Sequence, residues 1–333
     1  MPNDGLWAKD LNSPPISSLA IIVTQKCNLK CSYCLRDANS DEKPNPEISF
    51  EKLKNIIISA HRSGCRSTGL TGGEFYLYSK WRELLNLIGQ LKWNCLIETN
   101  GVIISQDKKI LEYTAESIGN KLSMLVSLDN YDERRHDFHR GKESFKKAVE
   151  TIKLIASQKV KLEVNAIITP GNMMTIKEVQ KYVQFCGNLG ANSINFGRVV
   201  AEARGNNDEL ILSPTQERQM VCAINECLTK KGNKKIKRGF FRNPGEMSEC
   251  KRIGREICIS PFGLHPCIFH QEIKVGDLDD FDQIIWSEFI PSLNFLQRGS
   301  RIGHSRESFT CFDCAKLLPE YFKKLKNTEI ISI

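Results

Sequence analysis

Apolar and polar positions follow two patterns between residue 18 and about residue 200. The first is a short apolar run with the length and composition of a buried strand, found at 18–24, 67–72, 94–99, 122–129, 160–169 and 192–200. The second has the apolar spacing of an amphipathic helix, found at 50–62, 81–91, 108–114, 145–157 and 176–189. Their alternation predicts an α/β fold with a parallel sheet, and six repeats suit a partial (β/α)6 TIM-type barrel better than a closed eight-fold one.

Right-handed crossovers would bring the carboxyl ends of all six strands to one rim, where α/β proteins form their sites. The pattern changes after residue 200: residues 214–231 have the spacing of one helix, with Ser213 as its N-cap, and 255–269 are typical of a hairpin. We therefore expect an N-terminal extension, a barrel, a linker helix with a basic loop, and a small cysteine-rich domain, at 1–17, 18–210, 211–249 and 250–333.

The composition excludes several classes of protein. Hydrophobic residues make up 41% of the chain and charged residues 26%, which is ordinary for a folded globular protein. No apolar run approaches the roughly 20 residues that span a bilayer, and the first residues lack the pattern of a signal peptide, so we expect a cytoplasmic location and no membrane partner. The net charge is +8, but the densest basic run, 230–238, has no interleaved aromatic residues, so no nucleic-acid partner is expected.

Thirteen cysteines in a reducing compartment indicate metal binding or redox chemistry. Cys27, Cys31 and Cys34 directly follow the first predicted strand with the spacing Cys-x3-Cys-x2-Cys. Three thiolates on one loop can bind three irons of a [4Fe–4S] cube and leave the fourth iron open to the amino and carboxylate groups of a methionine-type ligand. The competing interpretation is a zinc loop, which normally needs a fourth protein ligand that is not found nearby.

A second motif, Thr71-Gly72-Gly73-Glu74, directly follows the second predicted strand. A glycine pair lets the backbone approach a ligand closely, and Glu74 adds a carboxylate that can face an ammonium group. With the cysteine loop on the preceding strand, this combination resembles the radical S-adenosylmethionine (SAM) superfamily over roughly residues 18–200.

The resemblance implies roles for individual residues. Cys27, Cys31 and Cys34 would bind the cluster that cleaves SAM, the backbone of Tyr33 would lie near the adenine, and Gly72, Gly73 and Glu74 would bind the methionine amino group. Residues 126–141 resemble the fourth-strand segment of the branch that modifies peptides and sugars. There Ser127 and Arg140 would contact the ribose or carboxylate of SAM. Asn165 and Arg198 could point into the barrel, and the alternative is that they are core or rim residues.

The later cysteines form a second set around the predicted hairpin. Their arrangement resembles the twitch extension, the short form of the SPASM domain, which binds one auxiliary [4Fe–4S] cluster. By position the four ligands would be Cys250, Cys267, Cys311 and Cys314. Three residues separate Gly263 from Cys267 where the family has four, which leaves Cys258 as an alternative to Cys250. A zinc ribbon on four cysteines is the competing interpretation.

The chemistry implied by the resemblance begins with a flavodoxin- or ferredoxin-type reductant. SAM would then be cleaved to a 5′-deoxyadenosyl radical that abstracts hydrogen from a substrate carbon. The first hypothesis is peptide modification by epimerisation, cross-linking or oxidation, and the second is dehydrogenation or epimerisation of a sugar or cyclitol. A non-enzymatic iron–sulfur sensor or scaffold is the third, against which Glu74 argues. Cys258 and Cys222 could donate hydrogen to a substrate radical, and Cys65, Cys95 and Cys186 are expected in the core.

Overall fold

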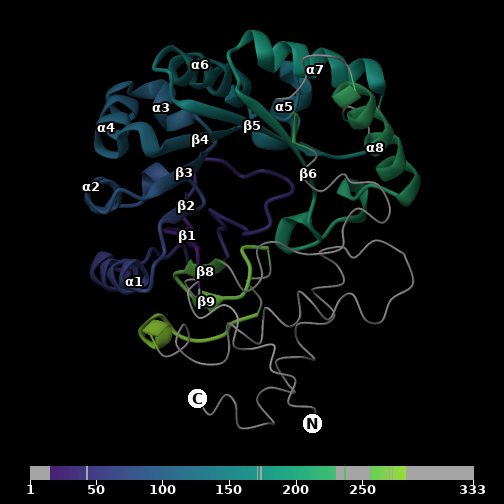
Figure 1. Cartoon of the computed structure of the whole chain (residues 1–333). Coiled ribbons are helices and arrows are strands. Elements are labelled where there is room, and N and C mark those ends of the chain that lie inside the picture. The colour runs from purple at the N-terminus through teal and green to yellow at the C-terminus, as the bar shows by residue number, and fades with distance from the viewer. Residues whose placement is uncertain are drawn as a thin grey trace, which may run out of the picture.

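The structure is a computed structural model that describes residues 16–42, 44–170, 172, 175–229, 236–237, 256–269, 271 and 273–282. Its described strands form one nine-stranded sheet in the order β7-β6-β5-β4-β3-β2-β1-β8-β9 (Figure 1). Every neighbouring pair is parallel except β8 and β9, which are antiparallel. The strands are β1 (Ser18–Ile22), β2 (Ser67–Thr71), β3 (Asn94–Thr99), β4 (Leu122–Ser127), β5 (Lys161–Ile168), β6 (Ser193–Arg198), β7 (Ile236–Lys237), β8 (Glu256–Ser260) and β9 (Gly263–His265).

Helices cover one face of this sheet, and the other face is the inner face of the barrel (Figure 1). They are α1 (Phe50–Arg62), α2 (Trp81–Gln90), α3 (Val102–Gln106), α4 (Lys109–Ile118), α5 (Glu133–Arg140), α6 (Ser144–Ser157), α7 (Ile176–Asn188) and α8 (Pro214–Thr229). Strand β4 shows the division, because Met124 and Val126 are fully buried in the main core, while Ser123 and Leu125, which alternate with them, are half-buried. Successive strand residues point to opposite faces, so the apolar core lies between sheet and helices.

The predicted partial barrel is confirmed, and all six predicted strands are present with ends within two residues of the prediction. Helix α4 ends four residues later than predicted, and two helices were not predicted at all. Helix α3 is only five residues long. Helix α5 has the sequence ERRHDFHR, which carries almost no apolar residues, and it buries only His136 and Arg140. A helix that buries polar groups gives no hydrophobic periodicity to read.

The predicted hairpin at 255–269 is also confirmed, as β8 and β9. Its pairing with the barrel was not predicted: β8 lies parallel to β1, with Ser18 opposite Glu256 and Ile21 opposite Ile259. The sheet therefore continues from the barrel into the cysteine-rich region. No helix among the described residues is long and apolar enough to cross a membrane.

Several predicted features lie outside the described residues. These are the N-terminal extension up to residue 15, most of the basic run 230–238, the boundary at residue 250, and Cys250, Cys311 and Cys314.

Candidate functional site

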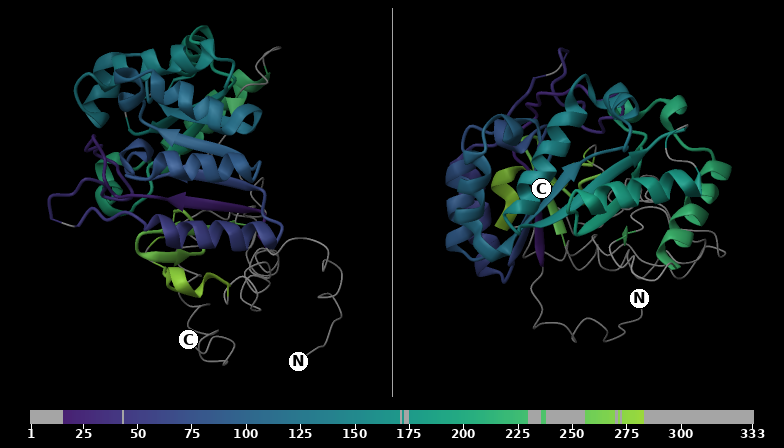
Figure 2. Two further views of the ribbon diagram at one scale, coloured as in Figure 1. Left: turned by 90° about the vertical axis from the view of Figure 1, so that its left-hand side faces the viewer. Right: turned by 90° about the horizontal axis from the view of Figure 1, so that it is seen from above.

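The cysteine loop, residues 23–49, leaves the carboxyl end of β1 at the rim to which the strands point (Figure 2, left). Its two ends are paired, because Thr24 forms an isolated β-bridge with Glu47 and the Ile48 N–H donates to the Val23 carbonyl at 2.9 Å. Cys27, Cys31 and Cys34 on this loop are half-buried free thiols. The loop thus presents all three thiols from a closed, anchored turn.

Backbone amides surround the thiols. The Leu29 N–H donates to the Cys27 sulfur at 3.4 Å, although burial raises the pKa of Cys27 to about 12. Burial acts in the same direction on Cys34, but hydrogen bonds from the backbone of Ala38 and Arg36 outweigh it and lower the pKa of Cys34. Hydrogen bonds to cysteine sulfur are a feature of iron–sulfur sites, where they help to set the cluster's potential.

This donor set fits a [4Fe–4S] cube. Within the described residues, no three His, Cys, Asp or Glu side chains gather around one point that could hold a single metal ion. A cube binds each cysteine to a different iron, so its three thiols need not converge on one point. The half-buried thiols and the nearby amide donors are compatible with that arrangement.

The Gly-Gly-Glu segment, residues 71–74, lies directly against the cysteine loop. The Gly73 N–H donates to the Thr24 carbonyl at 2.7 Å, and the Glu74 N–H donates to the Lys26 carbonyl at 2.9 Å. A Cβ on Gly73 would lie 2.4 Å from the Lys26 carbonyl oxygen, and one on Gly72 would lie 2.9 Å from the Thr24 oxygen. The sequence predicted that these glycines allow close approach to a ligand. The approach seen in the structure is to the cysteine loop itself.

Glu74 joins the ends of two strands to the loop. Its carboxylate is 1% exposed and accepts hydrogen bonds from the Thr99 hydroxyl at 2.8 Å and the Asn100 N–H at 2.9 Å. The Asn100 side chain in turn donates to Asn28 of the cysteine loop at 2.8 Å. Burial raises the pKa of Glu74 to about 7, against the opposing effect of these hydrogen bonds. Oε1 also accepts from the Tyr76 N–H at 3.5 Å, so it has both of its acceptor positions filled. Oε2 accepts only from Asn100 and keeps a further acceptor position, so the predicted contact with an ammonium group remains open to Oε2.

Arg140 forms a buried ion pair at the end of β4. Its guanidinium donates two parallel hydrogen bonds to Asp129, at 2.8 and 3.0 Å, and Asp129 is fully buried. The hydroxyl of Tyr33 also donates to Asp129, as does the Ile167 N–H at 3.0 Å. Although burial acts to raise it, the Arg140 charge keeps the pKa of Asp129 below its usual value. Arg140 therefore holds in place the Asp129 carboxylate that accepts from the Tyr33 hydroxyl of the cysteine loop.

Helix α5 makes further bonds to the same loop. The Ser32 N–H donates to the His139 carbonyl at 2.9 Å, and the two ring nitrogens of His139 lie 2.9 Å from the Ser32 hydroxyl and 3.1 Å from the Thr169 hydroxyl. His136 accepts from the Asp129 N–H at 3.1 Å. Sequence reasoning missed these residues. The available signal was the spacing of His136, His139 and Arg140, which places three polar side chains on one side of a helix.

The inner face carries a polar row across three strands. Ser127, Asn165 and Asn195 occupy matching positions on β4, β5 and β6, and the Asn195 amide donates to Asn165 at 2.6 Å. A cavity of about 430 Å³ lies farther along this face, lined by residues such as Ser67, Gly69 and Ser123. The structure thus places Ser127 beside Asn165 on the inner face, and for Asn165 the geometry supports the inward-pointing alternative.

Arg198 does not join this row. It lies opposite the core residue Ile168 and forms an ion pair of 2.6 Å with Glu217 of α8. A neighbouring position on the strand, Gly197, faces Asn165 instead, because successive strand residues alternate between faces. The geometry therefore supports the alternative for Arg198, that it is a core or rim residue and does not point into the barrel.

The remaining predicted cysteines lie in different environments. Cys258 on β8 is fully buried on the inner side, packed with Ala20, Ile22 and Ile268. Cys267 is buried just beyond β9, and its sulfur accepts from the Phe269 N–H at 3.4 Å. Cys222 is exposed on α8, which packs against α7 on the outside, so the structure does not bring it to the rim. The other thiols expected in the core are buried there: Cys65, Cys95 and Cys186.

The fold and these motifs define a radical SAM protein. Residues 21–186 match the family model described as the radical SAM superfamily, and the chain belongs to that superfamily. This confirms the resemblance predicted from the cysteine loop and the Gly-Gly-Glu segment.

Among curated proteins, the chain is similar to the antilisterial bacteriocin subtilosin biosynthesis protein AlbA of Bacillus subtilis (strain 168). The two are 25% identical over 279 residues, which cover 81% of this chain and 60% of AlbA. The sporulation killing factor maturation protein SkfB of the same organism is 28% identical over 219 residues, covering 65% of this chain and 51% of SkfB. The chain therefore spans little more than half the length of these two relatives.

Solved structures share the fold at lower identity. SuiB of Streptococcus suis, solved with its precursor peptide SuiA, is 18% identical with a TM-score of 0.67, covering 83% of this chain and 66% of SuiB. The protein anSMEcpe, solved with bound AdoMet, is 17% identical with a TM-score of 0.66, and 93% of each chain is covered. Both alignments extend well beyond the family match at residues 21–186.

Proposed function

We propose that the chain is a radical SAM enzyme that modifies a peptide. Cys27, Cys31 and Cys34 would hold a [4Fe–4S] cluster whose open iron binds SAM. The observation that carries the proposal is the direct contact of the Gly-Gly-Glu segment with the cysteine loop, where Gly73 and Glu74 donate to Thr24 and Lys26. When bound, the cluster and SAM supply a 5′-deoxyadenosyl radical that can take hydrogen from an unactivated carbon.

The residues around the loop would bind and orient SAM. Ser127 and Asn165 offer adjacent polar groups on the inner face for the ribose or carboxylate of SAM, and Glu74 Oε2 offers a further acceptor position for the methionine amino group. The side chain of Tyr33 donates to Asp129, so it is occupied within the protein. We therefore propose that Tyr33 contacts the adenine through its backbone. For Arg140 the ion pair with Asp129 favours a positioning role over direct contact with SAM.

We also propose one auxiliary [4Fe–4S] cluster of the twitch type. Its four proposed ligands are Cys250, Cys267, Cys311 and Cys314. Of these, Cys267 is the one that lies among the described residues. Cys258 packs among apolar side chains on β8, which favours Cys250 as the ligand. Iron and sulfide measured in a variant lacking Cys27, Cys31 and Cys34 test this cluster. Zinc without iron in that variant would contradict it.

Peptide modification is supported by the names of the relatives. AlbA and SkfB are named for bacteriocin biosynthesis and killing-factor maturation, and SuiB was solved with a precursor peptide. A flavodoxin- or ferredoxin-type protein would supply the electron. Epimerisation, cross-linking and oxidation are the outcomes to separate. The mass of the modified peptide separates epimerisation from the other two, and fragmentation by tandem mass spectrometry separates a cross-link from an oxidation. Cross-linking and oxidation remove hydrogen, whereas epimerisation in deuterated water exchanges it without loss.

The first test is cleavage of SAM by anaerobically reconstituted, chemically reduced protein. We expect 5′-deoxyadenosine, and we expect its formation to cease when Cys27, Cys31 and Cys34 are all replaced by alanine. Cys222→Ala is the matched control, because that thiol is exposed on α8 and should leave cleavage intact. If the fully loaded protein forms no more 5′-deoxyadenosine than the triple variant, the proposed function is wrong.

A further inference from the structure

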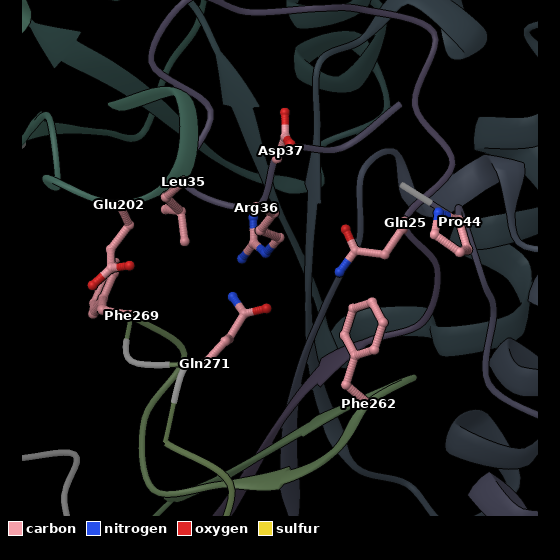
Figure 3. Close-up of a pocket in the computed structure, with 9 residues that line it drawn as sticks. All are labelled: Gln25, Leu35, Arg36, Asp37, Pro44, Glu202, Phe262, Phe269 and Gln271. Carbon is pink, nitrogen blue, oxygen red and sulfur yellow. The ribbon is translucent and has the colours of Figure 1, made fainter. Parts of the chain in front are cut away.

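A second hollow, which we call the hairpin pocket, lies beside the cysteine loop (Figure 3). Its volume is about 240 Å³, and three segments far apart in sequence line it: the cysteine loop, residue Glu202 after β6, and the region of the β8–β9 hairpin. Two lining residues, Leu35 and Arg36, directly follow Cys34 in sequence, and a third, Phe269, lies two residues after Cys267. These two cysteines belong to the two proposed clusters.

Two polar side chains in this pocket have buried atoms without partners. Gln25 is 4% exposed, and its buried Oε1 accepts no hydrogen bond. The Nε of Arg36 is likewise buried and donates none. Figure 3 shows both side chains directed into the pocket, with Phe262 and Gln271 facing them. A buried acceptor and a buried donor without partners both cost free energy, and native structures rarely leave such groups unpaired.

The two groups are complementary to one peptide unit. A backbone amide presents one N–H donor and one C=O acceptor, which match the vacant acceptor on Gln25 and the vacant donor on Arg36. Asp37 also lines the pocket but is ion-paired with Arg204 at 3.4 Å, whereas the charge of Glu202 opposes a carboxylate or phosphate ligand in the pocket. Phe262 at the hairpin turn is 52% exposed and Phe269 lies on the other side, so aromatic surface is available for neighbouring side chains.

We propose that the hairpin pocket binds one backbone amide of a peptide substrate. Its carbonyl accepts from Arg36 Nε and its N–H donates to Gln25 Oε1, which holds the peptide chain between the cysteine loop and the hairpin. This inference rests on the proposed function, because it takes the substrate to be a peptide. It adds the place where the peptide backbone is fixed and the two residues that fix it.

The test uses the full, reconstituted chain with SAM and a pool of acetylated, amidated hexapeptides of random sequence. The best binder is then N-methylated at one peptide bond at a time. We expect one N-methyl position to weaken binding by about tenfold, because it removes a single hydrogen bond. In Gln25→Leu the unmodified peptide should bind about tenfold more weakly, and N-methylation at that position should cost nothing further. Arg36→Lys, which keeps the charge but removes the Nε donor, should also weaken binding.

Stability separates a binding role from a structural one. Leucine in place of Gln25 removes an unpaired buried acceptor, so the midpoint of thermal unfolding should stay the same or rise while peptide binding falls. Gln184→Leu, on the exposed side of α7, is the matched control and should change neither.

The possible failures are distinguishable. Equal binding of the peptide by Gln25→Leu, Arg36→Lys and the unaltered chain would overturn the proposal. So would a sugar or cyclitol that binds in place of all peptides and depends on Gln25. If no hexapeptide binds while SAM is still cleaved, the peptide site is wrong and the radical SAM activity stands. If SAM is not cleaved, the proposed function itself has failed.

Discussion

Two adjacent glycines determine how closely the segment after β2 can lie against the cysteine loop. At Gly73 the space for a side chain is already filled by the Lys26 carbonyl and the Cys27 Cβ. That contact brings the Glu74 N–H within hydrogen-bonding distance of the loop. The neighbouring backbone leaves room for glycine alone at this position. The requirement therefore shows in the sequence as a glycine pair before Glu74.

Replacement of Gly73 by alanine should therefore displace the loop. The added Cβ would lie 2.4 Å from the Lys26 oxygen, and we expect a cost on the order of 1–3 kcal/mol together with loss of iron from the loop. Gly69→Ala is the matched control, because a Cβ at Gly69 in β2 meets nothing within 4 Å. Iron and sulfide per chain after reconstitution measure the effect. Equal iron content in the two variants would contradict the expectation.

Residues of the site were predictable only where a local motif marked them. The three cysteines and the Gly-Gly-Glu segment follow from their spacing after two predicted strands. Ser127 followed from the family resemblance, and Asn165 was named from its place on a predicted strand with its face left open. The partner of Arg140 did not follow, because Asp129 connects it to Tyr33 from a position far along the chain. Arg198 was ambiguous for a related reason: its face of the strand depends on a register that sequence did not fix.

Among the elements, α5 contributes most to the site relative to its length. It places His139 against Ser32 and Arg140 against Asp129, and so ties the cysteine loop to the ends of β4 and β5. Its polar sequence hid it from a search for apolar periodicity, although the buried bonds explain why the helix forms. The side chain of Asp132 caps its first turn by accepting from the Arg135 N–H.

The ion pair on α5 should matter more than an exposed pair on the same helix. Asp129→Asn leaves the buried Arg140 charge without a counter-charge, and we expect a loss of roughly 3–5 kcal/mol. Arg135→Ala removes a more exposed pair with Glu178 and should cost less than about 1 kcal/mol. Urea unfolding followed by circular dichroism gives both values. Similar midpoints for the two variants would show that the buried pair does not stabilise the loop.

At the scale of the whole molecule, the sheet separates a stabilising face from a functional one. Its outer face packs the helices in one large core, whereas its inner face carries polar and apolar residues together around a cavity. The division of strands and helices was predictable from periodicity. The attachment of β8 to β1 was not, because a short apolar run gives no indication of its partner strand.

Two neighbouring residues of β4 test this division. Met124 is fully buried in the outer core, and Met124→Ala should cost roughly 2–5 kcal/mol. Leu125 is half-buried on the inner face, so Leu125→Ala should cost clearly less, because fewer contacts and less buried area are lost. The unfolding midpoints of the two variants are compared. A larger loss of stability for Leu125→Ala than for Met124→Ala would contradict the assignment of the main core to the outer face of the sheet.

The pairing of β1 with β8 also has a consequence for the order of events during synthesis. Strand β1 leaves the ribosome well before β8, which begins at Glu256. At about 5–20 residues per second, one edge of β1 stays without its partner for on the order of ten seconds or more. The strand SLAII is apolar, and an open apolar edge can pair with other chains. The nascent protein is thus exposed to aggregation until its hairpin arrives, and slower translation lengthens that interval.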